Sequence, residues 1–326
     1  MTVQGGGPPV IGVDLGGTKI MAAVVADDNR ILGRGKRNTP AKEGGPAILK
    51  TMLECVDEAL EQSGLKRGDL AAGGIGSPGP LDVDAGVILF SANLSVKNYP
   101  VGPELSSALG IPIKVQNDVR VGGYGEFMLG AGRGYGDVLA AFVGTGIGGC
   151  LIQNGRIVAG STNNAGEIGH IVVKAGGPRC GCGNNGCMEA FASKTALSNR
   201  LVKAAKKRSC PLGDKIQRKG RLKSGDLAQA VRDKDEIAIR EVERAAYYLG
   251  LGLGGLVNVF GPQIVVIGGG MALALGQPFL ERITASARLQ IITDPTHCIK
   301  FALAGLGDDA GVLGASLYAR EMLAQG

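Results

Sequence analysis

Residues 10–26 read VIGVDLGGTKIMAAVVA, and the fold prediction starts from this stretch. An apolar run at 10–14 ends in Asp14 and a pair of glycines, and a second apolar run begins at Ile20, which predicts a β-hairpin closed around residues 16–19. Because glycine has no Cβ, the backbone N–H groups of such a turn can approach phosphate oxygens closely. The spacing does not fit a Walker loop, and a glycine turn alone is weak evidence, since many hairpins contain one.

The same pattern returns at residues 138–153, which read VLAAFVGTGIGGCLIQ. A strand, a glycine turn and a second strand therefore occur twice. Two similar α/β halves that each offer a glycine turn to a shared cleft predict a duplicated nucleotide-binding architecture. A third glycine cluster, at 268–270, ends the apolar run at 264–267 and suits close approach of the backbone to an adenosine.

Apolar periodicity and turn residues predict the remaining elements. Helices are expected at 46–62, 101–109, 121–129, 188–201, 227–231, 237–256 and 310–323. Further strands are expected at 31–37, 70–75, 113–116, 156–158 and 299–304.

The composition limits the class of protein. A chain of 326 residues, 44% hydrophobic and 20% charged, has enough apolar side chains for two domains with buried cores. Aromatic residues make up 4% and Trp is absent, which argues against base stacking and against a membrane aromatic belt. No apolar run reaches the length of a membrane span and no signal-peptide pattern is visible, so we expect a cytoplasmic protein whose seven Cys are reduced.

The formal net charge is +6, and many of the basic residues lie between 200 and 223. The simpler interpretation of that stretch is a solvated helix end and loop. The alternative is an electrostatic funnel for a polyanionic substrate such as a nucleotide. We expect neither nucleic acid nor a membrane as a partner.

Two carboxylates follow predicted strands and are candidates for chemistry. Asp118, after Asn117 and the strand at 113–116, can accept the proton of a substrate hydroxyl that attacks a γ-phosphoryl group. The alternative is a helix N-cap, for which both residue types are common, and the pair taken alone favours that cap. Asp14 at the end of the first strand can hold Mg²⁺ directly or through water.

One His and three Cys form a metal-like pattern. His170 is followed by Cys180, Cys182 and Cys187, and only two His occur in the whole chain. Three thiolates and one imidazole match a closed, tetrahedral zinc site, which predicts a structural zinc rather than a catalytic one. Three unrelated thiols beside a core His are the alternative.

Taken together, six segments resemble the ROK family. They are 14–19, 117–118, 144–149, 167–170, 180–189 and 306–311. That family comprises sugar kinases and related transcriptional repressors on the actin/hexokinase-like (ribonuclease H-like) fold, and the resemblance runs from about residue 10 to residue 319. It implies an α/β, duplicated two-domain architecture with ATP and sugar in the inter-domain cleft. We expect a smaller N-terminal domain at 1–118 plus about 305–326, and a larger domain at 119–304 that carries the zinc loop.

The resemblance also implies a role for each matching residue. Asp118 would be the catalytic base, and His170 would contact both zinc and sugar through its two ring nitrogens. The other expected sugar contacts are Gly79, Asn93, Asn117, Glu167 and Glu189. The expected ATP contacts are Gly12, Asp14, Gly16, Gly17, Thr18, Lys19, Gly144, Thr145, Gly146, Gly148, Gly269 and Gly270. A homodimer is implied as well.

The sequence therefore predicts an ATP- and Mg²⁺-dependent hexose kinase, with glucose as the first choice of substrate. N-acetylmannosamine, N-acetylglucosamine, mannose and fructose remain open as substrates, and polyphosphate as donor. A sugar-responsive repressor would need a DNA-binding helix-turn-helix before the first glycine turn, where fewer than ten residues precede Val10. A sugar-binding pseudokinase is disfavoured because Asp14, Asp118 and Thr145 are intact.

Overall fold

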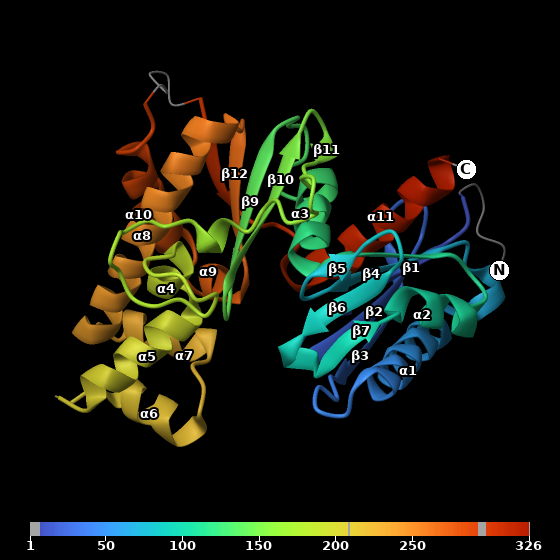
Figure 1. Cartoon of the computed structure of the whole chain (residues 1–326), viewed down its shortest axis with the longest axis horizontal. Coiled ribbons are helices and arrows are strands. Elements are labelled where there is room, and N and C mark those ends of the chain that lie inside the picture. Colours follow the sequence, from blue (N-terminus) through green and yellow to red (C-terminus); the bar gives the residue numbers. More distant parts are fainter. Residues whose placement is uncertain (1–6, 208, 293–297, 326) are drawn as a thin grey trace. The chain divides into compact units, whose positions relative to one another are not determined.

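The structure is a computed structural model that describes residues 7–207, 209–292 and 298–325 (Figure 1). The chain divides into two compact units. Unit 1 comprises Met1–Gly130, Ala159–Asn164 and Asp308–Gly326, and unit 2 comprises Ala131–Val158 and Ala165–Gly307.

Unit 1 is built on a five-stranded sheet with the order β3-β2-β1-β4-β8. Its strands are β1 (Val10–Leu15), β2 (Lys19–Val25), β3 (Ile31–Asn38), β4 (Gly73–Ser77) and β8 (Ile113–Asn117). The first three strands are antiparallel neighbours, whereas β4 and β8 run parallel to β1. The predicted hairpin is confirmed, because Leu15 pairs with Ile20 across the turn.

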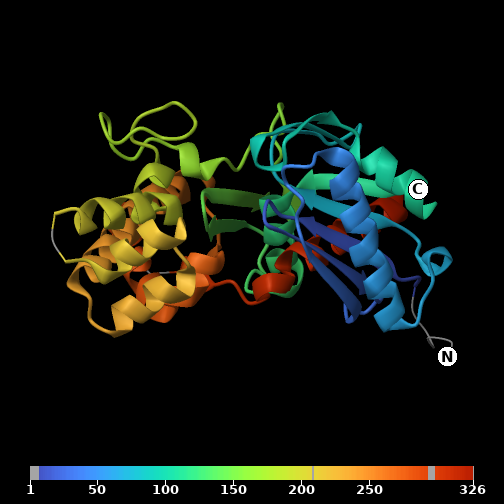
Figure 2. The ribbon, with the colours of Figure 1, turned by 90° about the horizontal axis from the view of Figure 1, so that it is seen from below.

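Helices cover both faces of this sheet. On one face, α1 (Gly45–Ser63) and α2 (Val101–Leu109) share a buried apolar core with the strands, and Figure 2 shows α1 lying along the strands. On the other face, a Cβ added at Gly12 of β1 would lie 2.0 Å from the carbonyl oxygen of Val312 in α11 (Ala310–Gln325). Glycine in β1 therefore lets α11 approach the sheet closely. The helix α3 (Asp118–Leu129) packs against α11.

A second, three-stranded antiparallel sheet in unit 1 was not predicted. It consists of β5 (Leu81–Asp82), β6 (Val87–Ser91) and β7 (Val96–Tyr99), with the 3₁₀ turn η2 (Ala92–Leu94) between the last two strands. These strands are too short to give a clear period-two pattern. A further 3₁₀ turn, η1 (Arg67–Asp69), precedes β4, which begins at Gly73 rather than at residue 70.

Unit 2 repeats the strand arrangement of unit 1. Its sheet has the order β11-β10-β9-β12-β13, in which β11, β10 and β9 are antiparallel and β12 and β13 run parallel to β9. The strands are β9 (Val138–Val143), β10 (Ile147–Gln153), β11 (Arg156–Ile157), β12 (Ile264–Gly268) and β13 (Lys300–Leu303). The predicted duplication is confirmed at the level of sheet topology.

Helices make up most of the rest of unit 2 (Figure 1). They are α4 (Met188–Ala192), α5 (Lys194–Ala205), α6 (Pro211–Lys219), α7 (Ser224–Arg232), α8 (Glu236–Phe260), α9 (Gly270–Leu275) and α10 (Gln277–Arg288), with the 3₁₀ turn η3 (Ile168–His170). A further 3₁₀ turn, η4 (Gly307–Asp309), spans the boundary at 307/308. The single helix predicted at 188–201 is two helices, because Ser193 interrupts it and caps α5 by accepting a hydrogen bond from the N–H of Ala196 at 3.2 Å. The helices α6, α9 and α10 were not predicted.

The boundary between the units differs from the predicted one. Residues 119–130 cluster with unit 1 rather than with the larger domain, because α3 packs against α11. The short segment Ala159–Asn164 also clusters with unit 1, and the last boundary lies at 307/308 instead of 305.

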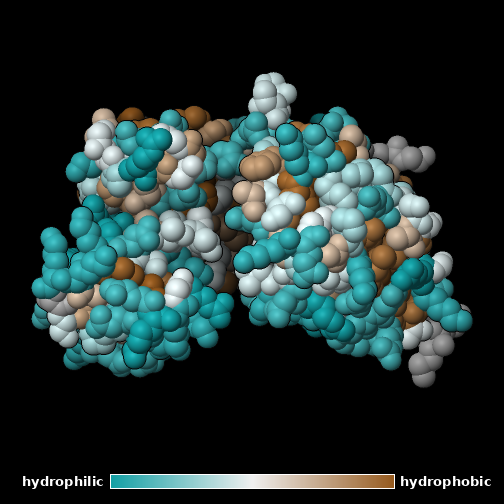
Figure 3. Space-filling model, turned by 60° about the horizontal axis from the view of Figure 1, so that its bottom comes forward, coloured by the Kyte–Doolittle hydropathy of each residue, from teal (hydrophilic) through white to brown (hydrophobic). Residues whose placement is uncertain are grey.

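None of the described helices is both long and apolar enough to span a membrane. On the face drawn in Figure 3, hydrophilic residues dominate the surface and hydrophobic ones are scattered among them.

Candidate active site

The first glycine turn, residues 16–19, joins β1 to β2 and is fixed by backbone hydrogen bonds. The N–H of Gly16 donates to the carbonyl of Lys19 at 3.0 Å, and the hydroxyl of Thr39 donates to the carbonyl of Gly16 at 2.6 Å. Gly17, Thr18 and Lys19 are exposed at the tip. The turn therefore presents N–H groups, a hydroxyl and an ammonium together, as a phosphate site requires.

Asp14 lies directly beneath this turn, next to a second acidic group. Burial, followed by the charges of Asp118 and Asp308, raises the pKa of Asp14 from 3.8 to about 7. A Cβ added at Gly311, in the first turn of α11, would lie 2.8 Å from Cγ of Asp14. A cation near Asp14 would stabilise its ionised form, and Mg²⁺ prefers carboxylate oxygen ligands.

Asn117, not Asp118, is the N-cap of α3. Its Oδ1 accepts hydrogen bonds from the N–H groups of Val119 and Arg120, at 3.0 and 3.1 Å. Asp118 is the first helical residue, and its Oδ1 accepts from the N–H of Val119 at 2.9 Å. The alternative role as a cap thus falls to Asn117, and the carboxylate at the start of α3 is compatible with its predicted role as a base.

A buried Arg connects the start of α3 to the segment Ala159–Asn164. Arg120 is 4% exposed and donates to the side-chain oxygens of Gln116 and Asn163 and, at 2.7 Å, to the main-chain carbonyl of Asn163. Gln116 Oε1 also accepts from the N–H of Asn117 at 2.9 Å. We call this set the Arg120 network. It was missed from the sequence, because neither Arg120 nor Asn163 belongs to a recognisable motif.

Two further predicted sugar contacts lie at the small sheet of unit 1. Gly79 has φ +100°, and a Cβ there would lie 2.4 Å from the carbonyl of Phe90, so this position requires glycine. Asn93 is exposed in η2, and a Cβ added at Gly17 would lie 3.6 Å from its own Cβ. The structure thus brings Asn93 beside the first glycine turn.

In unit 2, the second glycine turn (residues 144–149) lies beside the third glycine cluster. The N–H of Gly144 donates to the carbonyl of Gly146 at 2.9 Å. Gly269 has φ +86°, and a Cβ there would lie 2.6 Å from the backbone of Val143, directly before the turn. The predicted phosphate and adenosine contacts of this unit therefore adjoin one another.

Glu189 contacts the second glycine turn directly. Its Oε2 accepts the N–H of Ile147 at 2.9 Å, and a Cβ added at Gly146 would lie 2.5 Å from the same oxygen. The other oxygen, Oε1, accepts from Sγ of Cys180 at 3.7 Å. One carboxylate, expected on the sugar, is therefore placed between the glycine turn and the Cys-rich loop.

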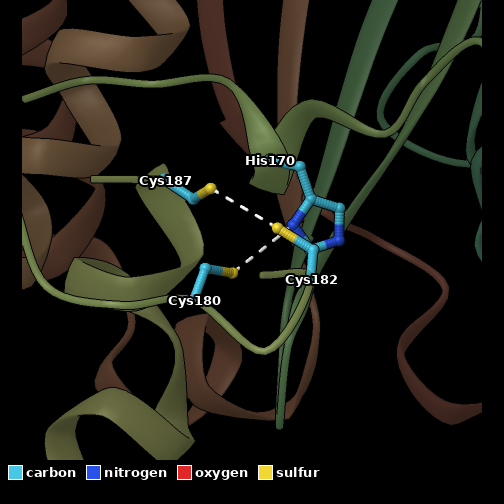
Figure 4. A group of neighbouring side chains, drawn as sticks. All are labelled: His170, Cys180, Cys182 and Cys187. Carbon is cyan, nitrogen blue, oxygen red and sulfur yellow. Dashed lines mark hydrogen bonds between the residues drawn. The ribbon is translucent and has the colours of Figure 1, made fainter. Parts of the chain in front are cut away.

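The four predicted zinc ligands converge, as Figure 4 shows. The ligand atoms of His170, Cys180, Cys182 and Cys187 all lie within 4.8 Å of one another. Sγ of Cys180 is 3.6 Å from Nδ1 of His170, and the sulfurs of Cys182 and Cys187 are 3.7 Å apart. Ligand atoms around a tetrahedral zinc ion are separated by roughly 3.5–3.8 Å. The arrangement therefore fits zinc, and we name it the Cys/His cluster.

The electrostatics of the Cys/His cluster also favour a bound cation. Burial, followed by the neighbouring thiols of Cys182 and Cys180, raises the pKa of Cys187 to about 12. Thiolates at this spacing repel one another unless a metal ion neutralises them.

The second nitrogen of His170 faces away from the sulfurs. Nε2 of His170 lies 3.9 Å from Oε2 of Glu167, and both side chains are partly accessible. Because Nδ1 is next to the sulfur of Cys180, the geometry leaves Nε2 and Glu167 together for a ligand outside the cluster. The predicted use of one ring nitrogen for each partner is compatible with this arrangement.

The comparisons with known proteins match this geometry along nearly the whole chain. The family model for "ROK family" matches residues 10–322. The crystal structure of a ROK hexokinase from Thermus thermophilus is 35% identical, with a TM-score of 0.82, over 98% of this chain and 100% of that one. A ROK glucokinase from Streptomyces griseus, crystallised with glucose and AMPPNP, is 32% identical with a TM-score of 0.83, over 96% and 99%. The glucokinase of Halalkalibacterium halodurans is 32% identical over 313 residues, which are 95% of this chain and 94% of that protein. A match of this extent, on top of the repeated sheets and paired glycine turns, means that the chain belongs to the ROK family.

Proposed function

We propose that this protein is an ATP-dependent glucokinase, which transfers the γ-phosphoryl group of ATP to glucose and releases glucose 6-phosphate and ADP. The observation that carries the proposal is the likeness, at 32% identity over 96% of the chain, to a ROK glucokinase crystallised with both glucose and an ATP analogue. The carboxylates and glycine turns expected to handle those two ligands are all present in this chain.

In the proposed reaction, Asp118 accepts the proton of the sugar 6-hydroxyl as its oxygen attacks the γ-phosphorus. A positioned general base contributes about 10²- to 10⁴-fold to such a step. The two glycine turns orient the phosphates, and a Mg²⁺ ion near Asp14 would neutralise charge on them. The side chains of Glu167, His170 and Glu189 form hydrogen bonds with the sugar hydroxyls. Asn93 and the side-chain amide of Asn117 contribute further hydrogen bonds.

We further propose that the Cys/His cluster holds a structural zinc ion. All four ligands come from the protein, which leaves no open position for chemistry. His170 would bind the ion through Nδ1, and the ring orientation set in this way would direct Nε2 to hydrogen-bond with the sugar.

ATP is the proposed donor, and the basic stretch at 200–223 does not need a separate role. Lys215 in α6 forms an ion pair with Asp226 in α7 at 2.7 Å, so part of its charge is neutralised within the helices. This supports the interpretation as a solvated helix end. A cytoplasmic homodimer remains our expectation for the assembly.

The test is a coupled ADP-release assay with Mg·ATP and a panel of glucose, mannose, fructose, N-acetylglucosamine and N-acetylmannosamine. We expect glucose to give the highest kcat/KM. A higher value with another sugar would correct the substrate while keeping the kinase. Turnover with polyphosphate but not with ATP would correct the donor, and no turnover with any pair by a folded protein would contradict the proposal.

A further inference from the structure

Residues 189–195, which run from α4 through Ser193 into the first turn of α5, make hydrogen bonds to the second glycine turn at three points. Glu189 accepts the N–H of Ile147 at 2.9 Å. The N–H of Lys194 donates to the carbonyl of Gly144 at 2.9 Å, and the hydroxyl of Thr195 donates to the carbonyl of Thr145 at 2.8 Å. We call this segment the α4–α5 junction.

These contacts matter most for the first half of the turn, residues 144–146, which lies between the ends of β9 and β10. Four of the turn's six residues are glycines, and glycine loses more backbone freedom on ordering than any other residue. Residues 147–149 pair with β9 as the start of β10, and the N–H of Gly144 donates to the carbonyl of Gly146. The α4–α5 junction therefore adds bonds to the carbonyls of Gly144 and Thr145 at the start of the turn, and one bond to the N–H of Ile147.

The other end of the α4–α5 junction is attached to the Cys/His cluster. Glu189 follows Cys187 by two residues, and its Oε1 lies 3.7 Å from Sγ of Cys180, so its carboxylate is a direct neighbour of the cluster. Met188 between them is fully buried, and its N–H donates to the carbonyl of Ile171 at 2.9 Å, next to His170. The side chain of Glu189 therefore contacts both the Cys/His cluster and the glycine turn, so a change in the order of the cluster can alter the turn.

We infer that the α4–α5 junction couples the Cys/His cluster to nucleotide binding, with Thr195 as a positioning residue for the second glycine turn. The inference rests on the proposed function, in which this turn binds ATP phosphates. Thr195 acts through the carbonyl of Thr145, which it fixes, and so controls the directions in which the turn offers its N–H groups. Nucleotide affinity should therefore depend on Thr195, whereas sugar affinity should not.

The test measures the Kd of Mg·AMPPNP by calorimetry in the absence of sugar. Thr195→Val removes the hydroxyl and keeps the shape, and should weaken binding about three- to tenfold, as expected for one lost hydrogen bond. Thr195→Ser keeps the donor and should bind within about twofold of the wild type. A matched control is Thr51→Val in α1, whose hydroxyl donates to the carbonyl of Ala47 at 3.0 Å and which should leave the Kd unchanged.

Two further readouts, zinc content and the Kd of glucose, separate positioning from a general loss of stability. In Thr195→Val, zinc content and the Kd of glucose should equal those of the wild type. Unchanged AMPPNP binding by Thr195→Val, or an equal weakening by Thr195→Ser, would overturn the inference while leaving the kinase intact. A wild-type protein that binds no AMPPNP would instead contradict the proposed function, and the inference with it.

The coupling itself is tested at the cluster. Cys182 is exposed, so Cys182→Ser removes one metal ligand without opening the core. We expect lower zinc content and, in protein that circular dichroism finds folded, weaker AMPPNP binding as well. Folded, zinc-depleted protein that binds AMPPNP as tightly as the wild type would contradict the coupling.

Discussion

Asp118 begins α3, and Asn117 supplies the N-cap of that helix. Because the cap does not depend on Asp118, substitution of Asp118 tests its chemical role rather than its contribution to the helix. Asp118→Asn keeps the size of the side chain but removes the proton acceptor. We expect kcat to fall about 10²- to 10⁴-fold with little change in the KM of either substrate. The measurement is steady-state ADP release.

A matched control for this substitution is Asp28→Asn. Asp28 is an exposed carboxylate after β2 that pairs with Arg30. Its substitution should leave both kinetic parameters unchanged. If Asp118→Asn kept more than a tenth of the wild-type kcat, Asp118 would not be the base.

Asp14 should make the stability of the ligand-free protein depend on pH. Its pKa is about 7 in the folded protein and 3.8 unfolded, so the folded state binds the proton more tightly and stability falls as pH rises from about 4 to about 7. The side chain of Asp14→Asn cannot ionise, so the free energy of unfolding of this variant does not include this decrease. Between pH 5 and pH 8 the free energy of unfolding of Asp14→Asn should rise, relative to the wild type, by up to about 3 kcal/mol.

This prediction is checked by urea unfolding at the two pH values in Mg²⁺-free buffer. Other titrating groups are common to both proteins, so their contributions cancel in the difference. A difference that does not change with pH would mean that Asp14 is already ionised at pH 5.

Among the elements, α3 and the segment Ala159–Asn164 depend on each other through the Arg120 network. Arg120→Met would leave the carbonyl and the side chain of Asn163 without a buried donor. We expect the free energy of unfolding to fall by about 2–4 kcal/mol. Arg133→Met, which alters an exposed Arg shortly after α3, should change it by less than about 0.5 kcal/mol. If chemical denaturation gave equal changes in the free energy of unfolding for the two substitutions, the Arg120 network would not stabilise the fold.

The elements that the sequence predicted well are those with a strong local signal. The hairpin at Val10–Val25 and the long helix α8 have unbroken apolar patterns, and both are confirmed. The break at Ser193 was missed because its capping role depends on the position of α5, which an apolar period does not encode. The strands β5 to β7 are too short to carry a period of their own.

Across the whole molecule, the Cys/His cluster shows most clearly which functional residues a local sequence pattern can predict. That its four side chains converge was predicted from their spacing and from the scarcity of His in the chain, because a zinc-binding loop is compact in sequence. Thr195 and Arg120 were not, because each contacts a segment 43 or more residues away, and one sequence contains no record of such contacts. Local motifs therefore predicted the residues expected to touch ligands, and only the fold revealed those that position them.

Zinc should support the stability of the whole protein as well as the loop. Cys182→Ser should lower the zinc stoichiometry and the Tm together, because a structural metal stabilises only the folded state. The checks are metal analysis and thermal unfolding. Cys298→Ser, also at an exposed Cys, is the control and should change neither value. Full zinc content in Cys182→Ser would remove Cys182 from the ligand set.

The division of the chain into units also has a consequence for engineering. The polypeptide passes from one unit to the other four times, at 130/131, 158/159, 164/165 and 307/308. Neither unit can therefore be expressed as one continuous fragment, and a split reporter cut between them would separate strands from the helices that complete their core. Insertions and circular permutation belong instead at exposed tips within one unit, such as the turn at 27–30 between β2 and β3.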